Sequence, residues 1–406
     1  MAKPKIRFKG YTDDWEQRKL GDLVGIYDGV HQTPDYQDSG IMFLSVENIA
    51  TLKSEKYISE EAFERDYNVY PEKGDILMTR IGDVGTTNVV ETAEKVAFYV
   101  SLALLKPNGI DSYFLSNAMK TNDFQKGLRE RTLVTAIPQK INKDEIGKIN
   151  IFITNNDEEQ KKIGAYFSSL DHLITLHQRK CEETKKLKKY MLQKMFPQNG
   201  QTVPEIRFAG FTDAWEQRKL GKLVDRVTRK NQDLVSELPL TISAQYGLID
   251  QNEFFDKRVA SKDVSGYYLI ENGEFAYNKS TSTDAPWGAV KRLDRYENGV
   301  LSTLYIVFGI KENNPVDSDF LVSYYSTNLW HKGIHEIAAE GARNHGLLNI
   351  APADFFETEL TMPQDIEEQK KIGKYFEELE RLITLHQHKC EQLQSMKKFM
   401  LQNMFV

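Results

Sequence analysis

The chain has 406 residues, with 53 Lys and Arg against 59 Asp and Glu, a formal net charge of −6. Its 40% hydrophobic and 11% aromatic residues can build ordinary cores, which excludes wholesale disorder. The two cysteines, Cys181 and Cys390, are too few and too far apart for a disulfide-built secreted scaffold. The N-terminus lacks the apolar stretch of a secretory signal, and no apolar run approaches the roughly 20 residues of a membrane helix. We therefore expect a cytoplasmic protein that binds no membrane.

The most informative feature of the sequence is an internal repeat. Residues 4–23 and 204–223 are identical at 15 of 20 positions, and residues 158–196 and 367–405 at 26 of 39. The offset between the copies grows from 200 to 209, so the second copy has gained residues only in its middle. This pattern predicts two halves related by a pseudo-two-fold, each with a constant frame around a variable centre. We expect a domain at 1–156, a helical region at 157–196, a linker at 197–203, a second domain at 204–364 and a second helical region at 365–406.

Short strands separated by polar turns are predicted in the first domain. Arg and Lys suit guanine edges, Asn and Gln suit adenine, and Ser, Thr and Lys suit phosphates, so these turns are equipped to contact DNA. The candidate contacts are His31, Gln32, Thr33, Asn48, Arg80, Thr86, Thr87, Asn88, Arg131, Thr132 and Lys140. Arg80 stands out because it follows the apolar strand 76–79 into a glycine-flanked loop; the alternative is a structural ion pair with Asp75 or Asp83.

Each half ends in a long segment without Gly or Pro after Gly164 or Gly373. Its apolar residues recur at alternating steps of four and three, the 3.5-residue period of a coiled coil. The seam of these helices includes Ile174, His177, Cys181, Ile383, His386 and Cys390. His-x3-Cys also places two potential metal ligands on one face, but a structural zinc needs four ligands at tight spacing. We therefore expect these residues to set the helix register and to bind no metal.

The helix ends and lengths suggest how the halves are joined. Asp157 and Asp365 are the expected caps, because acidic residues suit the first turn of a helix. A segment of roughly 38 residues rising about 1.5 Å per residue forms a rod of about 57 Å. Antiparallel pairing of two such rods within the chain would hold the variable centres apart at a fixed spacing.

The second domain repeats the first element for element. Its candidate contacts are Arg229, Lys230, Asn231, Gln245, Tyr246, Asn278, Lys279, Ser280, Thr281, Arg343, Asn344 and His345. Polar turns are common on any protein surface, so this composition also fits a scaffold with two peptide-binding modules. Trp15 and Trp215 lie in the constant frame, and we interpret them as packing residues rather than as base-stacking ones.

No arrangement of residues in the sequence predicts an enzyme. The Walker Gly-Lys-Ser/Thr and the Gly-x-Ser-x-Gly elbow do not occur. The segment 335–340 ends in Glu where a zinc protease needs a second His, and 313–316 is not the Asn/Asp-Pro-Pro-aromatic loop of amino-methyltransferases. We expect the chain to be non-catalytic and to bind no cofactor itself.

The whole chain resembles the specificity subunit of type I restriction-modification systems, in particular the staphylococcal branch. The likeness rests on the two Trp-Glu-Gln-Arg-Lys-Leu-Gly starts, the two Glu-Glu-Gln-Lys-Lys-Ile-Gly helix entries and the glycine-bounded stretch 74–85. It implies an α/β (α+β) fold with two mixed α/β target-recognition domains joined by two helical regions in an antiparallel coiled coil.

The resemblance also implies a function and partners. Each domain would read one half of an asymmetric, bipartite site in double-stranded DNA. Two modification (methyltransferase) subunits carrying S-adenosylmethionine would dock on the helical regions and methylate adenine, and restriction (motor-nuclease) subunits would join for cleavage. This chain would be the reader and scaffold of a multi-subunit adenine-N6 methyltransferase and endonuclease.

The charge distribution refines this expectation. Residues 158–196 and 367–405 together carry a net charge of +5, which leaves −11 for the remainder. Autonomous DNA binders draw much of their affinity from phosphate neutralisation. We therefore expect weak DNA binding by the isolated chain and tight binding in complex with its partners.

Overall fold

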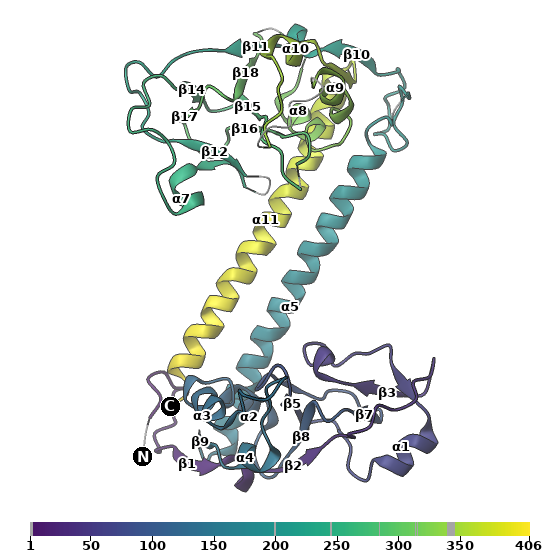
Figure 1. Cartoon of the computed structure of the whole chain (residues 1–406), viewed down its shortest axis with the longest axis vertical. Coiled ribbons are helices and arrows are strands. Elements are labelled where there is room, and N and C mark those ends of the chain that lie inside the picture. The colour runs from purple at the N-terminus through teal and green to yellow at the C-terminus, as the bar shows by residue number, and fades with distance from the viewer. Residues whose placement is uncertain are drawn as a thin grey trace. The chain divides into compact units, whose positions relative to one another are not determined.

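The computed structural model describes residues 3–198, 200–243, 246–283, 285–312, 314, 316–338 and 346–406. The chain divides into two compact units (Figure 1). Unit 1 comprises residues 1–179 and 386–406, and unit 2 comprises residues 180–385. Each unit thus combines one globular domain with part of both long helices, because each domain packs against the end of the helix that belongs to the other half of the sequence.

Unit 1 contains two small sheets and a two-stranded ladder. The ladder pairs β1 with β9 in antiparallel fashion, the first sheet has the order β2-β8-β5-β6, and the second has the order β4-β3-β7 with β3 and β7 parallel. The elements of its domain are β1 (Glu16–Lys19), η1 (Leu20–Asp22), β2 (Val24–Asp28), β3 (Ile41–Leu44), η2 (Val46–Asn48), β4 (Tyr57–Ile58), α1 (Glu60–Asp66), β5 (Ile76–Thr79), β6 (Thr87–Val89), β7 (Val96–Phe98), β8 (Leu102–Pro107), α2 (Ser112–Ala118), α3 (Asn122–Arg131), α4 (Lys143–Gly147) and β9 (Asn150–Ile153).

Unit 2 repeats this plan with a different second lobe. β10 pairs with β19 as β1 pairs with β9, and the main sheet has the order β11-β18-β15-β16. Two two-stranded antiparallel pairs, β12-β13 and β14-β17, replace the β4-β3-β7 sheet. The elements of its domain are β10 (Glu216–Lys219), α6 (Leu220–Leu223), β11 (Val224–Val227), β12 (Leu240–Ser243), β13 (Gly247–Asp250), α7 (Gln251–Phe255), β14 (Tyr268–Glu271), β15 (Phe275–Asn278), β16 (Ala289–Arg292), β17 (Asn298–Leu301), β18 (Ile306–Ile310), α8 (Ser318–Tyr324), α9 (His331–Ile337), α10 (Pro352–Glu357) and β19 (Glu359–Met362).

The frame tryptophans form the centre of each main core. Trp15 is fully buried and makes edge contacts with Phe114 and with Phe405 from the C-terminal end of the second long helix region. In unit 2, Trp215 packs in the same way between Phe320 and Phe196. The prediction that both are packing residues is confirmed. Large aromatic contacts of this kind fix the angle between a domain and the helix end beside it.

The two long helices are α5 (Asp157–Lys194) and α11 (Ile366–Asn403), each of 38 residues. In unit 1 the Sγ of Cys390 lies 3.6 Å from the carbonyl oxygen of Ile174, while Lys397 pairs with Asp171. Since α11 numbers rise as α5 numbers fall, the helices run antiparallel there. In unit 2 the Sγ of Cys181 lies 4.0 Å from the carbonyl of Ile383, and Lys188 pairs with Glu380, which gives the same direction.

The predicted N-terminal cap is found at one of the two long helices, α11, and not at α5. Asp365 accepts a hydrogen bond from the backbone N–H of Glu367, as predicted. At α5 the prediction of Asp157 is wrong, because Asp157 is already the first helical residue. The side chain of Asn156 accepts from the N–H of Glu159 instead. Within the described ranges, no helix is both long enough and apolar enough to span a bilayer.

Candidate nucleic-acid interface

The repeated helix entry is a clamp between each domain and its long helix. Both oxygens of the buried Glu159 carboxylate accept from Arg7, with Nε–Oε1 at 2.6 Å and Nη2–Oε2 at 2.8 Å. Gln160 accepts from the N–H of Asp111 at 2.9 Å and donates to the carbonyl of Thr154 at 2.7 Å. A Cβ on Gly164 would collide with Asp111, so helix α2 can approach α5 only over a glycine.

Unit 2 builds the same clamp from the second copy of the motif. Arg207 holds Glu368 at 2.6 and 2.8 Å, and Gln369 accepts from the N–H of Asp317 at 2.8 Å. A Cβ on Gly373 would lie 2.7 Å from the backbone nitrogen of Phe320. The motif Glu-Gln-x-x-x-Gly is therefore conserved between the halves because it fixes the domain to the helix, a role that sequence reasoning missed.

Arg80 does not project into solvent. Its side chain is 8% exposed and forms an ion pair with Asp28 of β2. The predicted alternatives have other partners: Asp75 binds Lys106 at 2.6 Å, and Asp83 accepts from the hydroxyl of Thr79 at 3.2 Å. Arg80 thus belongs to the base of its loop, and its assignment as a DNA contact is corrected on grounds of burial.

Two other candidates are also buried and bonded inside their domains. Thr87 is 6% exposed and its hydroxyl lies 3.0 Å from that of Ser116. Asn231 is fully buried, and it donates to the carbonyl of Ser236 at 2.8 Å while accepting from the N–H of the same residue. Thr87 thus joins β6 to α2, and Asn231 closes a turn, so neither side chain is exposed to a ligand.

The remaining candidates of unit 1 divide into exposed and half-buried groups. His31, Gln32, Thr33, Thr86 and Lys140 are exposed. The half-buried group hydrogen-bonds within the domain: Asn48 caps η2, Asn88 donates to the carbonyl of Ile49, Arg131 to that of Gly127 and Thr132 to that of Leu128. The exposed five are the better placed to meet a ligand without rearrangement.

In unit 2 the candidates form a similar mixture. Arg229 is exposed and pairs with Glu271 and Glu274, while Lys230 lies 4.1 Å from the ring centre of Tyr268. Tyr246 is 61% exposed. Asn278 is the last residue of β15, and Lys279, Ser280 and Thr281 follow it in one loop. Burial lowers the pKa of Lys279, and the hydroxyl of Thr281 donates to the carbonyl of Gly346. Gln245, Arg343, Asn344 and His345 lie outside the described residues.

The His/Cys positions of the helices occupy the predicted seam. Cys181 and Cys390 are buried, and the Nδ1 atoms of His177 and His386 lie 2.9 Å apart within unit 1. One ring must donate and the other accept in such a pair. No group of three or more potential metal ligands occurs among the residues that the structure describes.

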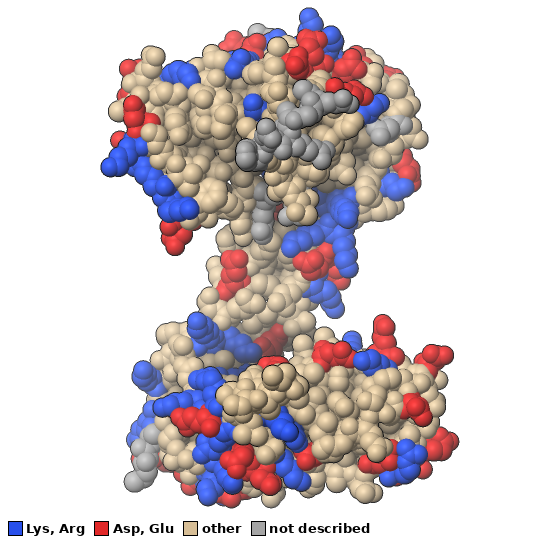
Figure 2. Space-filling view, in the orientation of Figure 1, with Lys and Arg blue, Asp and Glu red and all other residues tan. Residues whose placement is uncertain are grey.

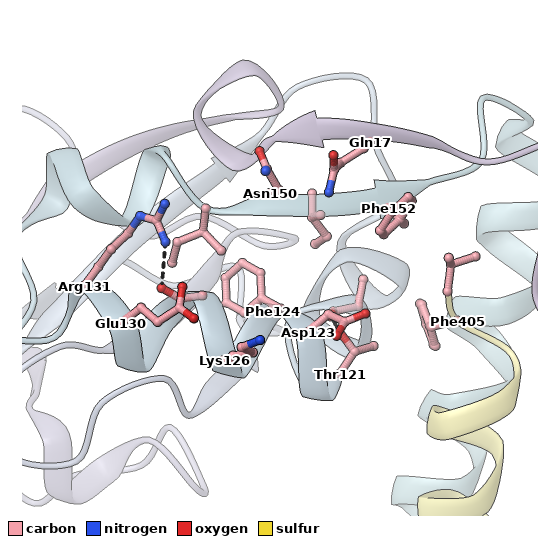
Figure 3. A pocket seen from close by; sticks show the side chains of 15 residues that line it. Gln17, Thr121, Asp123, Phe124, Lys126, Glu130, Arg131, Asn150, Phe152 and Phe405 are labelled. Atoms are coloured by element: carbon pink, nitrogen blue, oxygen red, sulfur yellow. Dashed lines mark hydrogen bonds between the residues drawn. The ribbon is translucent and has the colours of Figure 1, made fainter. Parts of the chain in front are cut away.

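A cavity of about 280 Å³ opens beside α3 in unit 1 (Figure 3). Gln17 and Asn150 from the β1–β9 ladder lie across from Lys126 and Asp123 of α3, and Phe124 and Phe405 form its apolar part. Arg131 lies at one end, where its guanidinium donates to the carbonyl of Gly127 at 3.0 Å. Sequence reasoning had singled out only Arg131 from this cavity, because the others are brought together by the β1–β9 pairing across more than 130 residues.

A neighbouring cavity of about 580 Å³ is lined by a half-buried lysine. Lys120, between α2 and α3, lies near Lys397 and Asp171, and burial together with the charge of Lys397 lowers the pKa of Lys120 to about 8. In unit 2, Lys291 of β16 lies near the equivalent pair, Lys188 and Glu380, and burial lowers its pKa also. The two domains thus bring a lysine to the same helix position from different elements.

Charge is unevenly spread over unit 1. On the face shown in Figure 2, Lys and Arg gather over the part that contains α2, α3 and β1 and are sparser over the lobe that contains β3 and α1. The sequence of that lobe explains the difference, since residues 29–71 include eight acidic and three basic residues. Phosphate contacts are therefore favoured near α3 rather than near α1.

The long helices carry exposed apolar side chains outside the seam. Met396 and Phe399 of α11 are 47% and 54% exposed in unit 1. Their counterparts at the repeat offset of 209, Leu187 and Tyr190 of α5, are 44% and 49% exposed in unit 2. Residues three apart lie on one side of a helix. We call each pair a helix patch; both patches escaped sequence reasoning because the heptad period draws attention to the seam.

Residues 12–186 match the family model described as the type I restriction modification DNA specificity domain. A curated relative of Methanocaldococcus jannaschii, named as the MjaX type I restriction enzyme specificity subunit, is 25% identical over 414 residues, with coverage of 95% of this chain and 91% of the relative. The chain is thus similar to type I restriction-modification specificity proteins, over residues 12–186 by the family model and over nearly its whole length by the curated relative. The resemblance drawn from the repeated motifs is thereby confirmed.

A solved structure of this family has the same fold. The crystal structure of the type I restriction-modification S subunit from M. genitalium aligns with a TM-score of 0.67 and 15% identity, covering 100% of this chain and 99% of that one. The expected fold of mixed helix and sheet is confirmed. In each unit the repeated motifs make the contacts of the frame, whereas residues that differ between the two copies lie in the loops.

Proposed function

We propose that the chain is the DNA-reading and scaffolding subunit of a type I restriction-modification complex. Its two target-recognition domains each read one half of an asymmetric, bipartite site in double-stranded DNA. The chain itself transfers no methyl group; S-adenosylmethionine and the catalytic residues belong to two modification subunits, and restriction subunits join for cleavage. The target adenine must leave the base stack to be methylated, so the catalytic pocket lies in the partner.

The distribution of constant and variable residues supports the reading role. The clamp residues Arg7, Glu159 and Gly164 recur in unit 2 with the same contacts, whereas the exposed loop residues differ between the units. A fixed frame with different loops is what two readers of unlike half-sites require. The family description, a DNA specificity domain, agrees with this assignment.

The observation that carries the proposal is that the two helix patches are equivalent while the loops are not. Adjoining exposed apolar side chains on a polar helix can form part of a protein-binding surface. Because the same pair recurs in each unit, each patch would bind one copy of the same partner. Two identical modification subunits on one specificity chain meet this requirement, and a pair of different partners does not.

The test is the stoichiometry of the assembled complex. Replacing Met396 and Phe399 by Ser should reduce the number of bound modification subunits from two to one in native mass spectrometry, and L187S with Y190S should do the same. The matched control is E391S with K398S, two exposed residues one heptad apart on another side of α11, which should leave two subunits bound. Two bound subunits in both patch variants would reject this docking surface.

A measurement of DNA binding distinguishes the proposed function from the alternative of a two-module peptide-binding scaffold. Gel-shift titration of the chain with its modification subunit should reveal one preferred duplex among scrambled competitors. A peptide scaffold would show no dependence on the DNA sequence, and methyl transfer by the isolated chain would reveal an enzyme instead.

A further inference from the structure

The loop between α3 and α4, residues 132–140, exposes apolar side chains in an unusual way. Leu133, Val134 and Ile137 are 45%, 69% and 100% exposed. Loops of this length ordinarily present polar residues, because an aliphatic side chain in water gains nothing from exposure. We call residues 132–140 the apolar loop.

The apolar loop is held at its base. Leu133 and Lys140 are bridged by backbone hydrogen bonds of 2.7 and 3.4 Å, and the N–H of Ala136 turns back to the carbonyl of Leu133. At the two ends, Leu128 and Ile141 are 1% and 0% exposed and belong to the main core of unit 1. The exposed aliphatic groups are therefore presented by a fixed hairpin.

The same loop is joined to the loop that follows strand β5. The N–H of Gly82 donates to the carbonyl of Gln139 at 2.9 Å, and the side-chain amide of Gln139 donates back to the carbonyl of Gly82 at 3.0 Å. The N–H of Ile141 donates to the carbonyl of Arg80. Beside this junction lies the exposed Thr86. The apolar tip and the polar loop thus form one surface.

We propose that the apolar loop is a wedge that inserts Val134 and Ile137 between base pairs of duplex DNA within or beside the half-site read by unit 1. Apolar side chains placed between base steps unstack them and kink the duplex. Such unstacking would assist the partner enzyme, which needs an adenine outside the stack. The inference rests on the proposed function, and it names Val134 and Ile137 as the residues that unstack the DNA.

Two observations favour DNA over a protein partner as the occupant. The first is charge: four basic residues frame the loop, Arg129, Arg131, Lys140 and Lys143. Residues 129–145 therefore carry a net charge of +1, whereas the whole domain (1–156) carries −3. Arg and Lys side chains at this position can pair with DNA phosphates on either side of the inserted loop.

The second observation is the asymmetry of the repeat. The bridge of Ile81 with Lys140 corresponds to that of Ser280 with Leu347, so the apolar loop corresponds to the segment that ends at Leu347. That segment reads Ala-Ala-Glu-Gly-Ala-Arg-Asn-His-Gly over 338–346 and has no aliphatic triad. A partner bound in two identical copies would require equivalent residues in both halves, as the helix patches provide. The DNA half-sites are the component that differs.

The test uses the full chain with its modification subunits and a duplex that contains the recognised site, with 2-aminopurine placed in turn at each position of the first half-site and its flanks. The wild-type complex should raise the fluorescence several-fold at one step, since unstacking relieves quenching. V134S with I137S should abolish that rise and weaken site binding by roughly tenfold, while I137L should retain it. V235S, at an aliphatic position 60% exposed in unit 2, is the matched control and should behave as wild type.

Three outcomes decide the matter. An unchanged fluorescence profile in V134S with I137S overturns the wedge and leaves the reading function standing. Loss of modification subunits from that variant in the absence of DNA also overturns it, because the loop would then be a protein contact. Absence of any sequence-dependent binding by the wild-type complex overturns the proposed function and the wedge with it.

Discussion

Replacing Glu159 by Gln tests whether the clamp holds the first domain to α5. The Glu159 side chain is fully buried and Arg7 is 12% exposed, and two hydrogen bonds of 2.6 and 2.8 Å join them. Removing one charge from a buried pair strands the other, which costs about 3–5 kcal/mol. We expect the lower end, about 3 kcal/mol, because Arg7 retains its hydrogen bond to the carbonyl of Asp13.

Hydrogen-exchange mass spectrometry can resolve this loss within unit 1. A loss of about 3 kcal/mol corresponds to a fall of about 150-fold in the protection of β2 and β5, with unit 2 unchanged. E368Q should produce the mirror result in unit 2. The control E16Q breaks an exposed pair with Arg18 and should change protection less than about twofold. A fall below about fivefold in E159Q would refute the reasoning.

Three further predictions follow from named contacts. The pKa of Lys120 is about 8 in the folded protein and 10.5 in the unfolded chain, so the unfolded state binds more protons between these pH values. The stability of unit 1 should therefore rise with pH in that window. The urea midpoint should be higher at pH 10 than at pH 7.5, and K120M should remove this difference. G164A should lower the melting temperature of unit 1, because its Cβ would lie 3.0 Å from the nitrogen of Phe114 as well as against Asp111. Insertion of seven residues into both α5 and α11 should lengthen the unread spacer of the methylated site; an unchanged spacer would contradict a measuring role for the helices.

Periodic features were predictable because the physics behind them is local. The 3.5-residue pattern predicted both long helices, and the placement of the seam cysteines in the interior follows from it. The repeat predicted that Trp15 and Trp215 would have the same packing role, since equal sequences in equal frames make equal contacts.

The sequence predicted where the loops lie along the chain, but it did not predict which of their side chains are exposed. Arg80 was expected at a loop surface, yet it turns to Asp28, which is 52 residues earlier and reaches it only through sheet pairing. Asn231 carries an amide that suits adenine, yet the same amide closes a turn with Ser236. A polar side chain can form its hydrogen bonds with a ligand or with the neighbouring backbone, and amino-acid composition does not show which of the two occurs.

The central claim is that constant frames bind identical partners while different loops read different half-sites. Its most direct test is long-read methylome sequencing of cells that express the modification subunit with this chain, or with a variant carrying V134S and I137S together with T86A in unit 1. We predict that the wild-type methylome shows one asymmetric, two-part motif, and that the variant loses or relaxes specificity in one part while the other part and the spacer are unchanged. Equal changes in both parts, or an unchanged motif, would contradict the account.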